Sequence, residues 1–340
     1  MKKSANAFSF AIVSILLLAL ILGCSGAGEQ KKAADWPKSR KIAGKEQKLS
    51  HISGLVTDDK FAYATIGGTI ADRNAGMSGL RKVDLKTGAA ETLDNGENMP
   101  QAENGGLAQD EKYVYWNGGG KLLRVSKTGG QPETIVAENV GIGVDLVVDG
   151  EKIYWANHGY YSPDAPTPPA PVYAVAKQGG KPEIFADAQK IAHALVADEK
   201  YVYWVTPTSI LKKAKAGGAV ETVFQASEKE GVDELSQDAT DLYFGFRGAG
   251  ESRWELRKIS KQGGAATVLV KPVSLKPFVI DDANVYFFNE DGLTADLLCR
   301  VAKTGGAPVT LDTGYSSGIA VAGKTEIYFA GLDDIYGFTK

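Results

Sequence analysis

Hydrophobic and polar residues alternate with a short period along most of this chain, and glycine-rich turns interrupt the alternation. In the segment Asp110–Val136, the apolar run Tyr113–Trp116 leads into a glycine turn, a second apolar run and a Thr-Gly-Gly turn. Runs of β-branched and aromatic residues between such turns predict strands, whereas repeated glycines disfavour a helix. The segment therefore predicts three strands joined by two turns.

This pattern returns seven times, and each copy carries a tyrosine at the same place. The tyrosines recur every 39 to 52 residues: Tyr63, Tyr115, Tyr154, Tyr203, Tyr243, Tyr286 and Tyr328. An apolar residue eight positions before the tyrosine, or nine in the last copy, predicts a fourth strand. Repeats of this length without helical periodicity are typical of propellers. We therefore predict an all-β fold, a seven-bladed β-propeller of four-stranded antiparallel blades.

Three other features recur in register. An aspartate stands five residues before the tyrosine in six copies, and we interpret it as a turn residue because its side chain can bond to the turn backbone. The aromatic residue after six of the tyrosines is predicted to pack between blades. Basic residues of the third strand are expected to face solvent: Arg124, Lys212, Lys258 and Arg300. A lysine precedes the next turn in six copies: Lys86, Lys127, Lys177, Lys215, Lys261 and Lys303.

The two ends of the repeat array predict how the ring closes. The segment Asp334–Lys340 supplies a third strand, so the last blade lacks its outer strand. The segment Arg40–Gln47 stands where an outer strand belongs ahead of the first blade. We predict that this N-terminal strand pairs with the C-terminal blade, because closure removes exposed strand edges. The propeller then spans residues 40–340.

The N-terminal segment has the pattern of a targeting signal. Lys2 and Lys3 precede an apolar run, Phe8–Leu22, that is short for a membrane span. The run ends in Ile21-Leu22-Gly23-Cys24, which resembles the lipobox of bacterial lipoproteins. That resemblance implies a signal peptide over residues 1–23, acylation of Cys24, and a lipid anchor in the cell envelope. Ser25 in the next position favours outer-membrane sorting in the same family, and the polar residues 24–39 are expected to form a flexible lipidated tether.

The repeats themselves resemble a known class. The recurring Asp...Val-Tyr-Trp blades are similar to the YWTD and TolB-like β-propellers, and the pattern D-x-x-x-[VI]-Y-[WF]...K-[TQA]-G-G resembles bacterial propeller lipoproteins. The resemblance covers Arg40–Lys340. The chain departs from the YWTD type because it has seven repeats rather than six and no Trp is followed by Thr-Asp. The resemblance implies a fold and no particular ligand.

Candidate site residues are those that deviate from the repeat near the start of the first strand of each blade, where a propeller channel opens. They form a mixed polar ring: His51, Glu103, Asn104, Asp145, His193, Asp233, Glu234, Lys276 and Tyr315. His51 and His193 belong to blades one and four, which makes joint ligation of one metal awkward. His193 with Asp145 or Asp233 is a better acid–base pair. We predict no metal site and no cofactor.

A second candidate is the long loop Asn157–Pro171, with five prolines and two adjacent tyrosines. Prolines hold such a loop extended, and exposed tyrosines are effective interface residues. The loop is predicted either to bind a partner through His158, Tyr160 and Tyr161 or to pack rigidly over the rim.

The charge balance narrows the function further. The chain has 38 basic and 41 acidic residues, and the basic ones are spread among the repeats, so no nucleic-acid surface is indicated. The leading hypothesis is a monomeric, membrane-anchored, non-enzymatic scaffold that binds an envelope protein or glycan, on either the periplasmic or the outer side. The alternatives are a lyase or hydrolase with a channel-mouth His–carboxylate site, and a surface-coat component.

Overall fold

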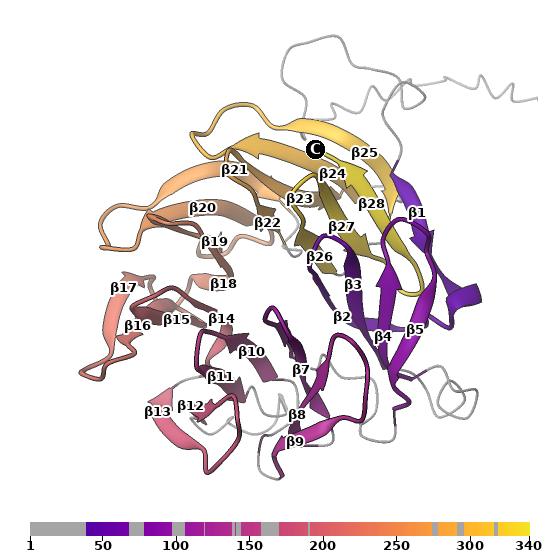
Figure 1. The fold of residues 1–340 in the computed structure, drawn as a ribbon. Coiled ribbons are helices and arrows are strands. Elements are labelled where there is room, and N and C mark those ends of the chain that lie inside the picture. Colours follow the sequence, from indigo (N-terminus) through magenta and orange to yellow (C-terminus); the bar gives the residue numbers. More distant parts are fainter. Residues whose placement is uncertain are drawn as a thin grey trace, which may run out of the picture.

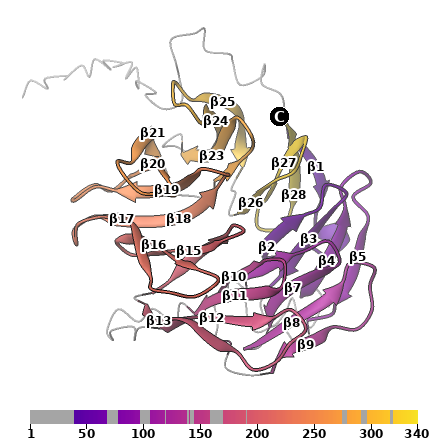
Figure 2. The same ribbon diagram turned by 60° about the vertical axis from the view of Figure 1, so that its left-hand side comes forward.

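The chain forms a ring of antiparallel sheets in this computed structural model, in which the described residues are 39–67, 78–96, 106–118, 120–137, 140, 144–157, 170–189, 191–273, 278–290, 296–315 and 319–340. These residues form seven four-stranded sheets. Figures 1 and 2 show the sheets following one another around a central axis in chain order. The prediction of a seven-bladed β-propeller is confirmed.

Each of the first six blades runs outward from its first strand to its fourth. Blade one consists of β2 (Ile52–Thr57), β3 (Phe61–Ile66), β4 (Gly79–Asp84) and β5 (Ala90–Asp94). Blade two consists of β6 (Leu107–Gln109), β7 (Tyr113–Gly118), β8 (Lys121–Ser126) and β9 (Glu133–Val136). Blade three consists of β10 (Val144–Val148), β11 (Lys152–Asn157), β12 (Ala170–Ala176) and β13 (Glu183–Gln189).

Blades four to six continue the same order. Blade four consists of β14 (His193–Ala197), β15 (Tyr201–Thr206), β16 (Ser209–Ala214) and β17 (Glu221–Gln225). Blade five consists of β18 (Gly231–Gln237), β19 (Asp241–Arg247), β20 (Trp254–Ser260) and β21 (Thr267–Val273). Blade six consists of β22 (Val279–Ile280), β23 (Asn284–Glu290), β24 (Asp296–Ala302) and β25 (Val309–Tyr315). Blade seven has β26 (Ile319–Ala322), β27 (Glu326–Ala330), β28 (Ile335–Thr339) and, as its outer strand, β1 (Arg40–Ala43).

The N-terminal strand closes the ring as predicted. β1 pairs antiparallel with β28, with Arg40 opposite Gly337, and Figure 1 shows indigo β1 beside yellow β28. The expected strand to Gln47 is too long, because β1 ends at Ala43 and Lys45–Gln47 form a short 3-10 helix, η2. That turn begins where the Gln47 side chain accepts a hydrogen bond from the Gly44 N–H, at 2.8 Å.

The aromatic residues that follow the repeat tyrosines pack between blades, which confirms their predicted role. Trp116 of β7 is buried against Tyr63 and Leu80 of blade one. Trp204 of β15 packs in the same way against Tyr154 of blade three. The hydrophobic core is therefore a series of layers between neighbouring sheets, and each blade depends on the next for burial.

The repeated aspartates form hairpin turns, as predicted. Oδ1 of Asp110 accepts hydrogen bonds from the backbone N–H groups of Lys112 and Tyr113, both at 2.8 Å. Oδ2 of the same carboxylate accepts the hydroxyl of Tyr115 at 2.8 Å. One carboxylate thus fixes both the turn and the buried tyrosine of its own blade.

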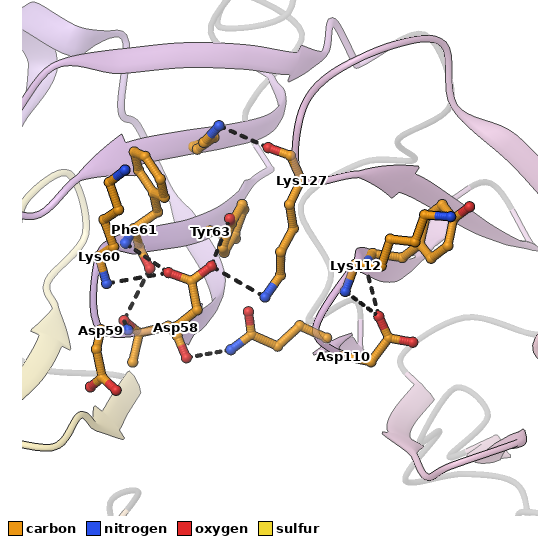
Figure 3. A network of polar contacts seen from close by, with 12 residues as sticks. Asp58, Asp59, Lys60, Phe61, Tyr63, Asp110, Lys112 and Lys127 are labelled. Carbon is orange, nitrogen blue, oxygen red and sulfur yellow. Dashed lines mark hydrogen bonds and ion pairs between the residues drawn. The ribbon is translucent and has the colours of Figure 1, made fainter.

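The same carboxylate also joins neighbouring blades, which the sequence interpretation missed. In Figure 3 the carboxylate of Asp58 in blade one contacts both Tyr63 and Lys127, the latter from blade two. We call this ion pair the Asp–Lys clamp. It joins six successive pairs of blades, with N–O distances of 2.7 to 3.6 Å: Asp58–Lys127, Asp110–Lys177, Asp149–Lys215, Asp198–Lys261, Asp238–Lys303 and Asp281–Lys340.

The expectation that the third-strand cations face solvent is wrong for two of them. Arg124 donates through Nη1 to the backbone oxygen of Lys177 in the next blade at 2.6 Å. Lys212, only 7% exposed, donates in the same way to the oxygen of Lys261 at 3.1 Å. The adjacent sheets lie close enough for these long side chains to reach across, so their charges tie blades together.

The junction between blades seven and one is built differently. Gly323 stands in place of the clamp aspartate. Leu85 stands in place of the clamp lysine. Its backbone N–H donates to the backbone oxygen of Lys60, just as the backbone N–H of Lys127 donates to the backbone oxygen of Lys112. Lys86, which the sequence pattern groups with the other lysines, therefore stands one residue beyond the equivalent position. At this junction Arg40 of β1 joins the two blades instead. It donates a hydrogen bond to the backbone oxygen of Leu85 in blade one at 3.1 Å and forms an ion pair with Glu326 in blade seven at 3.2 Å.

Candidate functional site

Five of the predicted site residues have described side chains, and four of them lie together. Asp145, His193, Asp233 and Glu234 come from β10, β14 and β18, the inner strands of blades three, four and five. We call this group the channel-mouth cluster. Glu103, Asn104, Lys276 and the loop residues His158, Tyr160 and Tyr161 lie outside the described residues, as does Cys24, and the side chain of Tyr315 is likewise not described.

His193 and Asp233 form the central contact of the cluster. Each stands two residues before the leucine that lies eight positions ahead of the repeat tyrosine, Leu195 in blade four and Leu235 in blade five. We call this the repeat leucine. The ring geometry therefore places His193 and Asp233 at equivalent positions on neighbouring inner strands. The Nε2 atom of His193 lies 2.9 Å from Oδ1 of Asp233. The same carboxylate oxygen accepts the backbone N–H of Glu234 at 2.8 Å, which holds the Asp233 side chain in place.

The second ring nitrogen of His193 is also engaged. Nδ1 lies 3.1 Å from the backbone oxygen of Ile191, an atom that can only accept a hydrogen bond. Burial lowers the pKa of His193, but the hydrogen bond and negative charge of Asp233 outweigh that effect and raise it above its ordinary value. Because both nitrogens face acceptors, the arrangement favours the doubly protonated imidazolium.

Asp145 links a third blade to the cluster. Its carboxylate accepts a hydrogen bond from the backbone N–H of Ala194, the residue after His193. Asp145 stands one residue before its repeat leucine, which is the position of Ala194 and Glu234 in the next two blades. A side chain from blade three therefore fixes the backbone that carries His193.

The backbone is unusual at this level of the ring. Ala194 and Glu234 have φ values of 49° and 53°, in the left-handed region that non-glycine residues rarely occupy. Each lies where the pairing with the second strand of its blade shifts register. Such bulges redirect a side chain at a strand end, and strained residues of this kind are enriched at functional sites.

Glu234 has the most perturbed carboxyl of the cluster. Burial, reinforced by the negative charges of Asp233 and Asp145, raises its pKa to about 7. Asp233 behaves differently: burial raises its pKa, but the hydrogen bond from His193 more than compensates and lowers it overall. The cluster thus combines a histidine with a raised pKa, an aspartate with a lowered pKa and a glutamate with a pKa of about 7.

His51 belongs to a separate group at the junction of blades one and seven. Its backbone N–H donates to Asp333 at 3.2 Å, and its Nδ1 lies 3.0 Å from the hydroxyl of Ser50. Asp333 also pairs with Lys45 at 3.0 Å. In the described part of the chain, no three His, Cys, Asp or Glu residues are arranged to hold a metal ion.

Some contributors to the cluster could not be found from sequence. The Ile191 oxygen and the Ala194 N–H are backbone atoms, so their residue types carry no signal. The one available sign was the shared distance of His193 and Asp233 from their repeat leucines, which places them side by side once the strands are aligned.

Comparisons with known proteins support the fold alone. No family model matches the sequence, and no curated protein matches it. An oligogalacturonate lyase in complex with manganese is similar in structure, with a TM-score of 0.62, 13% identity, and coverage of 88% of this chain and 89% of that chain. BamB from Moraxella catarrhalis gives a TM-score of 0.52 at 11% identity over 84% of this chain and 85% of that chain.

A computationally designed protein, Ika8, is also similar, with a TM-score of 0.56, 11% identity, and coverage of 88% of this chain and 100% of that chain. A lyase, BamB and a designed protein thus share this architecture with the chain. The propeller by itself carries no function.

Proposed function

We propose that this protein is a lipid-anchored, non-enzymatic binding module of the bacterial cell envelope. It binds an envelope protein or glycan at the channel-mouth cluster, and Cys24 tethers it to the membrane, with outer-membrane sorting implied by Ser25. The predicted loop around Tyr160 and Tyr161 belongs to the same proposal as a partner contact. Binding through a rigid ring suits a scaffold, because little conformational entropy is lost on association.

The observation that carries this proposal is the saturation of His193. Both of its ring nitrogens already face hydrogen-bond acceptors, Asp233 and the Ile191 oxygen. A general base needs a free nitrogen within reach of its substrate. His193 therefore serves as a fixed positive centre that organises the surrounding carboxylates, and these are suited to contact cationic or hydroxyl groups of a partner.

The anchor rests on the N-terminal sequence. Ser39, the last residue of the proposed tether, donates two hydrogen bonds to Asp312 of blade six, at 2.5 and 2.6 Å. No helix among the described residues is long and apolar enough to cross a membrane. Confinement to a membrane raises the effective concentration of the module for partners on the same surface.

The anchor is tested by metabolic labelling with an alkyne palmitate analogue. The full chain is expected to take up label, Cys24→Ser to lose it, and Cys299→Ser to keep it. Intact mass should show removal of residues 1–23 and an acylated Cys24. Label on Cys24→Ser, or a mature protein in which Cys24 forms a disulfide with Cys299, would overturn the lipid anchor.

The binding surface is tested by site-specific photo-crosslinking. A benzophenone amino acid replaces Glu234 at the channel mouth or, as a control, the exposed Glu111 in the hairpin turn of blade two at the other end of the inner strands. Full-length protein is mixed with detergent-solubilised native envelope and irradiated. A discrete adduct from position 234 that is absent from position 111 supports the proposal. Equal adducts at both positions, or none at position 234, count against it.

The alternative function, a lyase or hydrolase, has one observation in its favour. The carboxyl of Glu234, with a pKa of about 7, is suited to general acid–base chemistry at neutral pH. Under this alternative Glu234, rather than His193, transfers the proton. Screening with envelope glycans should then reveal an activity that depends on a group of pKa near 7 and that Glu234→Gln removes.

A further inference from the structure

A groove opens at the other end of the inner strands, between blades four and five. It has a volume of about 690 Å³. The hairpin turns Asp198–Lys200 and Asp238–Thr240 form its walls, with Tyr201, Gln237 and Lys261 also in the lining. Because His193 begins β14 and Asp198 directly follows its end, the strand separates this groove from the channel-mouth cluster. Its volume lies in the range of small-molecule sites.

The main charges in the groove are already paired within the protein. Lys261 contacts Asp198 at 3.0 Å, and Asp238 contacts Lys303 at 2.8 Å. Burial raises the pKa of Asp198, but the backbone N–H groups of its turn and Lys261 oppose this effect and hold it at about 2. The two other charged residues of the lining, Glu199 and Lys200, carry opposite charges. The groove therefore suits a neutral ligand, since a charged one would have to compete with these pairs.

The aromatic ring of the groove is less covered than its counterparts. In blade one, Lys60 and Lys82 lie 4.9 and 4.4 Å from the ring centre of Phe61. In blade two, Lys112 and Arg124 lie over Tyr113 in the same way, at 5.2 and 4.6 Å.

Tyr201 occupies the equivalent position in blade four and has one such cation, Lys212, at 4.8 Å. Lys200, the counterpart of Lys60 and Lys112, is exposed as they are but does not lie over the neighbouring ring. Tyr201 thus offers aromatic surface that is occupied by a lysine in the other two blades. Such a surface can stack against a flat apolar face of a ligand.

A polar acceptor stands beside this ring. Nε2 of Gln237 donates to the backbone oxygen of Ala197 at 2.7 Å. Its Oε1 atom is buried and has no hydrogen-bond partner among the described residues. A buried acceptor left unpaired costs free energy that a ligand donor recovers. Since the local charges are balanced, the fitting donor is a neutral hydroxyl.

We infer that this groove binds a neutral sugar residue, whose apolar ring face lies on Tyr201 and one of whose hydroxyls donates to Gln237. Sugars combine an apolar face with several neutral hydroxyls, which is the pairing that the groove presents. The inference deepens the proposed binding function by naming a glycan as ligand. It concerns a different surface from the channel-mouth cluster, so each can fail without the other.

The test uses full-length protein in deuterated detergent and saturation-transfer NMR with four neutral methyl glycosides: glucoside, galactoside, mannoside and N-acetylglucosaminide. At least one is expected to bind, and Gln237→Leu and Tyr201→Ala should each weaken it tenfold or more. Gln109→Leu is the matched control, because Gln109 takes the place of Gln237 in blade two but lies beside the doubly covered Phe61. It should leave binding unchanged. Near-ultraviolet circular dichroism verifies that each variant is folded.

The outcomes separate the groove from the proposed function. If none of the four glycosides binds, or if binding survives Gln237→Leu and Tyr201→Ala, the sugar site is wrong. If binding is instead lost in Asp233→Asn, the sugar sits at the channel mouth and the groove is excluded. A neutral tetrasaccharide tested beside its monosaccharide distinguishes a glycan chain, which binds more tightly, from a free sugar.

Discussion

Lys177 of blade three places its Nζ atom 2.8 Å from Oδ2 of Asp110 in blade two. Burial raises the pKa of Asp110, but the hydrogen bond from Lys177 and those from its own turn more than compensate and hold it at about 2. The two side chains are only 17% and 20% exposed, so this pair is shielded more than an ordinary surface ion pair. The Asp–Lys clamp therefore links the hairpin of one blade to the edge of the next.

The first prediction concerns the energy of this clamp. A double-mutant cycle of Asp110→Asn and Lys177→Met should give a coupling energy of about 1 kcal/mol, measured by urea unfolding at pH 7. Asn at position 110 keeps the Oδ1 atom that accepts the hydrogen bonds of the turn. The cycle therefore isolates the interaction between the carboxylate of Asp110 and the ammonium group of Lys177. The control cycle is Lys152–Glu183, whose side chains are 40% and 58% exposed. It should give about 0.3 kcal/mol, and equal values for both pairs would contradict the role of the clamp.

The second prediction concerns the junction of blades seven and one, where Arg40 substitutes for the missing clamp. Arg40→Met removes the contacts to Leu85 and Glu326, both made by a side chain that is 47% exposed. The global effect should be small, about 0.5 kcal/mol. Amide hydrogens of the β1–β28 pairing should nevertheless exchange three- to tenfold faster in hydrogen–deuterium exchange, because local opening needs less free energy.

The matched control for Arg40 is Lys324→Met, since the Lys324 side chain is 88% exposed at the same junction. It should leave the exchange of β28 unchanged. Uniformly faster exchange in every blade after Arg40→Met would mean that Arg40 supports the whole fold rather than the closing strand.

The fold was predictable because its determinants repeat. Seven tyrosines in register identify the blades, and the missing outer strand at one end implied the pairing of β1 with β28. The clamps were missed although their residues repeat, because a recurring Asp and Lys have a sufficient local explanation in turns. The channel-mouth residues were found because they deviate from the repeat. Gln237 was missed because the sequence does not distinguish it from Gln109, whose Oε1 is likewise buried and unpaired; only the neighbouring Tyr201, with one cation over its ring, sets it apart.

The third prediction concerns the charge of His193. Since its pKa is raised above 6.5, both ring nitrogens should remain protonated at pH 6.5 in nitrogen-15 NMR of the histidine ring. The stabilisation from this pairing is complete below the unfolded pKa and is lost as pH rises through the folded one. Asp233→Asn removes the charged acceptor and should lower the His193 pKa. A neutral His193 at pH 6.5 in the wild-type protein would contradict the arrangement.

The fourth prediction concerns Glu234, a carboxyl whose pKa rises on folding. Its pKa rises from 4.5 to about 7 on folding, because burial and two neighbouring aspartates disfavour the carboxylate. The stability this group contributes is therefore complete below pH 4.5 and is lost as pH rises through about 7. Glu234→Gln removes the titration but keeps the shape, and Gln tolerates the left-handed backbone no worse than Glu.

The variant should therefore be more stable than wild type by about 3 kcal/mol at pH 8, and about equal to it at pH 4.5. Urea unfolding at several pH values between these limits measures the difference, and Glu111→Gln, at an exposed turn, should give a flat comparison. A pH-independent effect of Glu234→Gln would mean that Glu234 is ionised throughout. In that case the channel mouth holds a permanent negative charge, and the acid–base alternative for this residue loses its basis.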